Sequence, residues 1–356
     1  MVQTANDLLR PSMAIIADGQ TSSGSFLASP NFPTYRYSWF RDGAFVAQAL
    51  DLWGEHDRSG RFYDWCARTI MRNRDVVTHV LKGPSNEIPG AHLHTRYRAD
   101  GSPAKEDWPT FQLDGFGTFL WGMTEHVRLT GKPIDPAWRE AANLVVSYLN
   151  HLWRSPNFDC WEEFPDRVHI STLCAIYGGS SAVADRLDDH RGRALAEDVG
   201  AFVRAQTTED GHLPKFLGTQ DVDASLLWAC TPFGLLKPND PVMSATATKI
   251  ESDLLGPSGG VHRYNSDAYY GGGEWILLTA LLGEHWLLRG QNARASDALL
   301  WIEECADETG ALPEQVAVDL IAPEPVQTWV NRWGPVAQPL LWSHAAYLRL
   351  RSLAGQ

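Results

Sequence analysis

The sequence reads as one helix-forming segment after another, with few of the alternating β-branched runs that build a large sheet. No linker, low-complexity segment or internal repeat divides it. We therefore expect an all-α fold in a single domain, residues 1–356, a length that many helical barrels use as one unit. The expected helices are residues 42–53, 60–77, 115–129, 136–153, 169–187, 194–206, 224–229, 242–255, 273–289, 293–305 and 338–352.

Two kinds of helix are present. Residues 44–50 and 275–282 are apolar nearly all round, which is typical of helices buried on every side. Residues 141–152 instead form an amphipathic pattern through Leu144, Val145, Tyr148 and Leu152. An inner ring of buried helices inside an outer ring of amphipathic ones predicts an α/α barrel with long loops at one end.

The expected loops are unusually long and rich in Gly, Pro and Trp. They cover residues 29–39, 84–109, 157–166, 256–270 and 310–339. Loops longer than about 12–15 residues in a compact domain are usually functional, so we expect the site among them.

The composition excludes several classes of partner. A net charge of −13 argues against nucleic acid and anionic membranes, which require basic patches. The first residues lack the pattern of a signal peptide, and the densest apolar stretch is too short to span a bilayer. The five cysteines are widely spaced, as free thiols in a reducing compartment would be. We expect a cytoplasmic protein; the oligomeric state is not indicated.

Two loop glutamates are candidates for acid–base chemistry. Glu162 lies between Trp161 and Phe164, where partial desolvation would raise its pKa as a general acid requires. Glu314 follows Pro313 and precedes Gln315. Each has an ordinary alternative, since Glu162 and Glu163 would also suit a solvated loop, and Pro-Glu is common at helix starts.

Other segments favour sugar recognition over metal or nucleotide chemistry. Arg41 and Asp42, among aromatic residues, could grip neighbouring sugar hydroxyls, or could be a buried pair in which Asp42 caps a helix. The 15 Trp suit the apolar faces of sugar rings, although most should be core. His92 and His94 lack a third ligand at convincing spacing, so we expect no metal site and no cofactor. No nucleophile elbow or dinucleotide-binding glycine motif is present.

Taken in order, these segments resemble glycoside hydrolase family 15, the glucoamylase family. The resemblance rests on five segments between Tyr35 and Leu350: Trp39-Phe40-Arg41-Asp42, Trp108 with Gln112-Leu113-Asp114-Gly115, Trp161-Glu162-Glu163, Arg263-Tyr264, and Glu314-Gln315 with Trp342-Ser343.

The resemblance implies an (α/α)6 barrel that hydrolyses terminal α-glucosidic bonds with inversion, releasing β-D-glucose. It implies Glu162 as general acid and Glu314 as general base. Arg41, Asp42 and Arg263 would bind the terminal glucose, and Glu163 would contact the next sugar. Tyr35 would hydrogen-bond the base and Trp108 would support the acid side. Trp39, Trp161 and Trp342 would complete the substrate-binding set.

The sequence departs from the family pattern in ways that concern the substrate. It has no room for the β-sandwich or starch-binding module that many members carry, and residues 317–335 match no familiar version of the loop that faces the leaving sugar. We therefore expect isomaltose or short α-1,6 or α-1,4 glucosides as substrates, with the linkage preference left open. Trp329 and Trp333 would either lie across the site or pack as core. A trehalase or lyase on the same architecture, and a non-catalytic sugar-binding barrel, remain alternatives.

Overall fold

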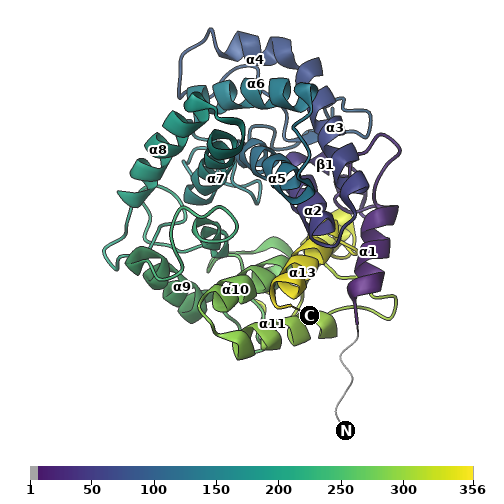
Figure 1. The fold of residues 1–356 in the computed structure, drawn as a ribbon. Helices are drawn as coiled ribbons and strands as arrows, with labels where there is room; N and C mark the ends of the chain where they lie inside the picture. Colours follow the sequence, from purple (N-terminus) through teal and green to yellow (C-terminus); the bar gives the residue numbers. More distant parts are fainter. Residues whose placement is uncertain (1–6, 356) are drawn as a thin grey trace.

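The helices of the protein form two concentric rings (Figure 1). A computed structural model describes residues 7–355. Around the inner ring each element packs against the next, and the last packs against the first. Its members are α2 (Phe40–Leu52), α5 (Asp114–Thr130), α7 (Ile170–Leu187), the 3₁₀ helix η2 (Ala224–Ala229), α10 (Ile276–Leu288) and α13 (Leu341–Leu353).

An outer helix packs behind each part of the inner ring. In the chain, outer and inner elements alternate, so the expected (α/α)6 barrel is confirmed. The outer members are α1 (Leu9–Asp18), α3 (His56–Arg72), α6 (Pro136–Leu152), α8 (His190–Arg204), α9 (Pro241–Leu254) and α11 (Asn292–Glu304).

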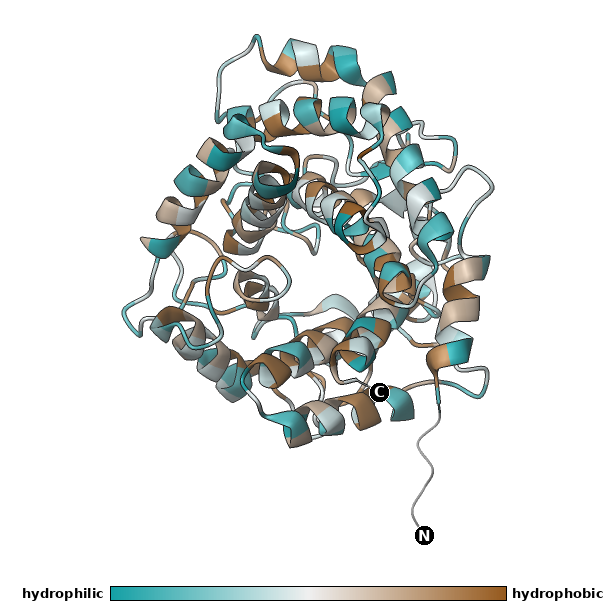
Figure 2. Ribbon diagram, viewed as in Figure 1, coloured by the Kyte–Doolittle hydropathy of each residue, from teal (hydrophilic) through white to brown (hydrophobic). Residues whose placement is uncertain are grey.

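The two rings differ in the way the sequence predicted. Every residue of α2 from Phe40 to Asp51 is buried, and so is every residue of α10 from Ile276 to Trp286. The outer helices carry hydrophilic residues on their outward faces (Figure 2). Inner helices also approach closely at small residues: a Cβ on Gly117 of α5 would collide with the backbone of Ala175 in α7.

Several boundaries differ from those expected. The helix expected at 60–77 is broken at Asn73, whose side-chain amide donates to the Thr69 carbonyl, and the chain continues as α4 (Arg74–Val80). The loop expected at 310–339 contains a helix, α12 (Val326–Trp333), which begins directly after Pro325. Helix α1 was not expected, and residues 224–229 form a 3₁₀ rather than an α-helix.

Short extended segments tie the long loops together at one end of the barrel. Strand β1 (Ser38–Trp39) pairs antiparallel with β2 (Arg96–Tyr97), and β3 (Glu274–Trp275) pairs antiparallel with β4 (Gln315–Val316). Strands β1 and β3 lead directly into α2 and α10, so they position the residues at the N-terminal ends of these inner helices. The 3₁₀ turns η1 (Pro33–Tyr35) and η3 (Tyr269–Gly271) lie in the same loops. Within residues 7–355, no helix has the length and apolar character needed to cross a membrane.

Candidate active site

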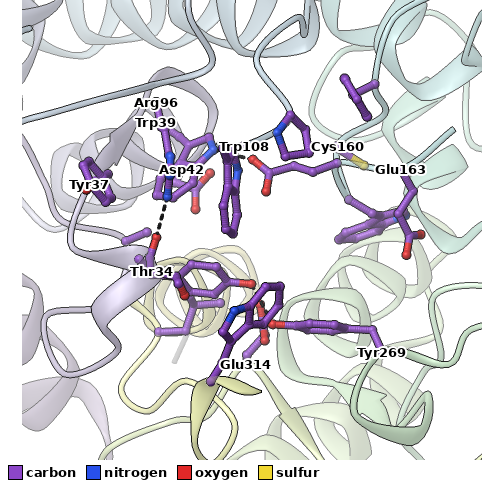
Figure 3. A pocket seen from close by; sticks show the side chains of 18 of the residues that line it. Thr34, Tyr37, Trp39, Asp42, Arg96, Trp108, Cys160, Glu163, Tyr269 and Glu314 are labelled. Atoms are coloured by element: carbon purple, nitrogen blue, oxygen red, sulfur yellow. Dashed lines mark hydrogen bonds between the residues drawn. The ribbon is translucent and has the colours of Figure 1, made fainter. Parts of the chain in front are cut away.

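A cavity of about 670 Å³ opens at the N-terminal ends of the inner helices. Its wall comes from the long loops and the first residues of α2 and α13 (Figure 3). Every residue selected from the sequence lines it: Tyr35, Trp39, Arg41, Asp42, Trp108, Trp161, Glu162, Glu163, Arg263, Glu314 and Trp342. The structure thus brings these residues together at one cavity, and their roles in binding and catalysis stay predictions.

Glu162 sits on a tight turn with its carboxyl held by an indole. Its φ of 68° is left-handed, a conformation that costs a non-glycine residue about 1–3 kcal/mol. Trp39 Nε1 donates to Glu162 Oε1 over 2.7 Å. Burial raises the pKa of Glu162 to about 7, against the lowering effect of the Arg41 charge and the indoles of Trp108 and Trp39. The carboxyl therefore retains its proton to higher pH than an ordinary glutamate.

Glu314 lies in different surroundings, just before β4. It is 4% exposed, and its backbone N–H donates to the Ala337 carbonyl over 2.9 Å. Burial raises the pKa of Glu314 to about 8, while the Arg263 charge and the hydroxyls of Tyr35 and Tyr269 lower it. Those two hydroxyls are 2.8 Å apart. In Figure 3, Glu314 and Tyr269 lie across the cavity from Trp39 and Trp108.

Arg41 and Asp42 form part of the cavity floor at the start of α2. Arg41 Nη1 donates to Asp114 Oδ2 over 3.1 Å, and Arg41 Nε lies 3.3 Å from Asp42 Oδ2. The helix begins at Phe40 with Trp39 as its N-cap, so Asp42 is not the cap. Asp42 Oδ2 is buried against the Arg41 guanidinium and accepts no hydrogen bond from the described residues, while the Asp42 side chain lines the cavity.

Arg263 is another lining residue of the cavity and is held rigidly. Its Nε donates to Asp267 Oδ2 over 2.7 Å and its Nη2 donates to Asp267 Oδ1, a bidentate pair. Its Nη2 also lies 3.5 Å from Glu163 Oε1, and the Tyr264 hydroxyl donates to the other oxygen of Glu163. Glu163 is therefore fixed with part of its carboxyl facing the cavity, a position suited to a sugar hydroxyl.

Helix α12 forms the remaining wall of the cavity. Its position shows whether Trp329 and Trp333 lie across the site or pack as core. None of its residues is buried, and both Trp329 and Trp333 line the cavity. The ring of Trp333 lies 6.0 Å from that of Trp108 and 6.3 Å from that of Tyr269, between centroids. The core alternative is therefore wrong, and α12 extends over the site.

Some lining residues were not selected from the sequence. Arg96 is buried with its guanidinium 4.0 Å from the Trp108 ring centroid and 4.3 Å from that of Tyr37. Tyr269, Trp275 and the residues of α12 also line the cavity. The spacing of Arg263 and Asp267 could have suggested their pairing, but no local motif marks Arg96 or Tyr269.

The histidines considered as metal ligands have other partners. His92 Nε2 is 2.9 Å from Thr110 Oγ1, and His94 Nδ1 accepts from the Arg96 N–H. Near the opposite end of the barrel, Asp51, His56 and His126 do bring one ligand atom each within 4.8 Å of one another. Their separation in the sequence concealed this group. Both Nδ1 atoms lie 2.9 Å from Asp51 Oδ1, a hydrogen-bond distance.

Comparison with known proteins agrees with this geometry. The family model described as glycosyl hydrolases family 15 matches residues 8–302. An isomaltose glucohydrolase of Kribbella flavida is 41% identical over 98% of this chain and 93% of its own length. A trehalase of Thermoplasma volcanium is more distant, 22% identical over 79% of this chain and 47% of its own length.

A solved glycosidase has the same fold, with a TM-score of 0.93 and 40% identity over 99% of this chain and 97% of its own. A variant of that glycosidase was solved in complex with glucose. The family match ends before Glu314, but both full-length similarities extend past it. The chain therefore belongs to glycosyl hydrolase family 15 and is a glycoside hydrolase.

Proposed function

We propose that the protein is an inverting exo-α-glucosidase of short oligosaccharides, with isomaltose as its preferred substrate. Glu162 donates a proton to the glycosidic oxygen as the bond from that oxygen to C1 breaks. Glu314 takes a proton from a water whose oxygen bonds to C1 from the opposite face. The products are β-D-glucose and the shortened sugar.

One observation carries the mechanism. Two carboxyls face one cavity from separate loops, a half-buried Glu162 beside Trp39 and a buried Glu314 beside Tyr269. Burial raises both pKa values, so the site can hold one carboxyl protonated and one ionised near neutral pH. In inverting glycosidases the two carboxyls stand about 6.5–9.5 Å apart, leaving room for the water.

The cavity wall supports an exo-acting enzyme for short chains. Arg41, Asp42 and Trp342 lie where the inner helices begin, and they suit the terminal glucose. Trp329 and Trp333 of α12 lie beside the leaving-sugar side and limit the space beyond a second ring. The similarity to an isomaltose glucohydrolase favours isomaltose over the other disaccharides. The five unpaired cysteines fit a cytoplasmic enzyme.

The test compares glucose release from isomaltose, maltose, trehalose and longer isomalto- and malto-oligosaccharides. NMR identifies the anomer of the glucose that is released first. We expect the highest kcat/KM for isomaltose and initial formation of the β-anomer. Initial α-glucose would contradict inversion. Trehalose as the best substrate would instead favour a trehalase, and no release from any of these sugars would contradict the proposed activity.

A further inference from the structure

Lys215 is a buried lysine beneath the acid side of the cavity. It is 4% exposed and lies in the segment between α8 and η2. Its Nζ is 2.9 Å from Asp223 Oδ2 and 3.7 Å from Asp159 Oδ2. It also lies 3.1 Å from the centroid of the Tyr264 ring. Neither Lys215 nor its two aspartates lines the cavity, so the three do not meet the substrate.

Asp159 shapes the turn that carries Glu162. Its Oδ1 accepts the N–H of Trp161 over 3.0 Å and that of Glu163 over 2.9 Å. Its backbone carbonyl accepts the N–H of Glu162 over 2.9 Å. Glu162 and Phe164 both have left-handed φ, of 68° and 51°, so this turn is strained and persists because these bonds hold it.

Asp223 fixes the indole next to the acid. It accepts from Trp161 Nε1 over 3.0 Å, and it also caps η2 by accepting the Ser225 N–H over 2.9 Å. The Trp161 ring forms cavity wall, tilted against Trp275 with 5.3 Å between centroids. The Lys215 ammonium thus links two parts of the site. Through Asp159 it contacts the turn that carries Glu162, and through Asp223 it contacts the Trp161 indole in the cavity wall.

The charge of Lys215 favours the ionised forms of Asp159 and Asp223. Burial raises the pKa of Asp159 to about 7, and the nearby Lys215 opposes that rise. The same ammonium is a leading cause of the lowered pKa of Asp223. Without it, two buried carboxylates would face each other and at least one would take up a proton, becoming a weaker acceptor for the N–H groups that define the turn.

We propose that Lys215 is a positioning residue for the general acid, acting through Asp159 and Asp223 on the turn that aims Glu162 at the glycosidic oxygen. This inference rests on the proposed function, in which Glu162 protonates the leaving group. It predicts that loss of Lys215 harms only the step that needs this proton.

A pair of substrates isolates that step. Isomaltose needs a proton on its leaving oxygen, whereas α-glucosyl fluoride loses fluoride as an anion without one, and both need the base to activate water. Lys215→Met should lower kcat for isomaltose about 10- to 100-fold, the scale of a displaced catalytic group. Its kcat for α-glucosyl fluoride should stay within about threefold of wild type.

The controls separate positioning from folding. Lys215→Arg retains the charge and should restore most of the isomaltose activity. Lys215→Met with Asp223→Asn removes one buried negative charge as well, and it provides a folded background if the single variant unfolds. Lys249→Met removes a lysine from a surface pair with Asp253 and should leave both substrates at wild-type rates. Circular dichroism and Tm establish that each variant is folded.

The outcomes distinguish failure of the inference from failure of the proposed function. Glu162→Gln should lose isomaltose and keep the fluoride; if it keeps both or loses both, Glu162 is not the acid. If Glu162→Gln behaves as expected while a folded Lys215→Met variant loses both substrates equally, or neither, the positioning role is wrong.

Discussion

The two sides of the cavity present a carboxyl in opposite ways. On the acid side, Glu162 is held by an indole N–H from the start of α2 and stands on a strained turn above a buried ion network. On the base side, Glu314 directly precedes β4 and lies beside the hydroxyls of Tyr35 and Tyr269. An indole can only donate, but a hydroxyl can also accept. The acid side therefore fixes a carboxyl, while the base side can also orient a water.

The largest expected effect tests this division directly. Glu162→Gln and Glu314→Gln should each lower kcat for isomaltose about 10²- to 10⁴-fold, since each removes one proton-transfer group. Both variants retain the shape of the side chain, so Tm should change little. Glu324→Gln, on an exposed residue before α12, serves as the matched control and should be silent.

Two outcomes would contradict this assignment of an acid side and a base side. If Glu314→Gln hydrolysed α-glucosyl fluoride at the wild-type rate, water activation would not depend on Glu314 and the base side would have been misassigned. Near wild-type isomaltose activity in either variant would remove that carboxyl from the mechanism.

The pH dependence sharpens the comparison further. With pKa values of about 7 for Glu162 and about 8 for Glu314, kcat/KM should form a bell with its maximum between these values. Ordinary carboxyls would place it far lower. Because the higher value belongs to the proposed base, only a minority of free enzyme carries an ionised Glu314 together with a protonated Glu162.

Removing one donor from each side should change opposite ends of this bell. Tyr35→Phe removes a hydroxyl that lowers the pKa of Glu314. The pKa rises, less base is ionised well below it, and kcat/KM should fall mainly at acidic pH, by up to about tenfold for one pKa unit. Trp39→Phe removes a donor that lowers the pKa of Glu162. More acid then stays protonated, so kcat/KM itself should rise at alkaline pH and stay unchanged at acidic pH.

The measurement is a full pH profile of kcat/KM on isomaltose for both variants and wild type. If absolute kcat/KM changed at the same end of the profile in both variants, Tyr35 and Trp39 would act on one shared titration rather than on separate carboxyls.

Much of this architecture was visible in the sequence because it depends on burial. The continuous apolar runs of α2 and α10 predicted an inner ring, since such helices have no face to offer water. The site residues were found because five short segments, taken in order, resemble those of family 15, and the loops that carry them meet at the N-terminal ends of the inner helices. Glu162, Glu314 and Arg41 thus met in one cavity without any contact being known.

The features that escaped prediction depend on tertiary contact. Helix α12 was missed because its tryptophans face a cavity rather than the core, and prolines precede and follow it. Lys215 belongs to no motif, and its role exists only where Asp159 and Asp223 converge on it. The Asp51 group at the far end was hidden for the same reason, since its members come from α2, α3 and α5.

The smallest expected effect concerns α12, which contacts both sides at once. The ring of Trp333 lies 6.0 Å from that of Trp108 on the acid side and 6.3 Å from that of Tyr269 on the base side, so we expect the leaving sugar to contact it. Trp333→Ala removes a stacking surface worth about 0.5–1.5 kcal/mol, so kcat/KM for isomaltose should fall about two- to tenfold. The same change opens space beyond the second ring, so the ratio of isomaltotriose to isomaltose should rise. Gln327→Ala, on an exposed residue of α12, should alter neither value.

If Trp333→Ala lowered isomaltose turnover without raising the ratio of isomaltotriose to isomaltose, α12 would bind the leaving sugar without limiting its length. A steady rise of kcat/KM with chain length in the wild-type enzyme would sink the preference for short substrates, while leaving Glu162 and Glu314 as assigned.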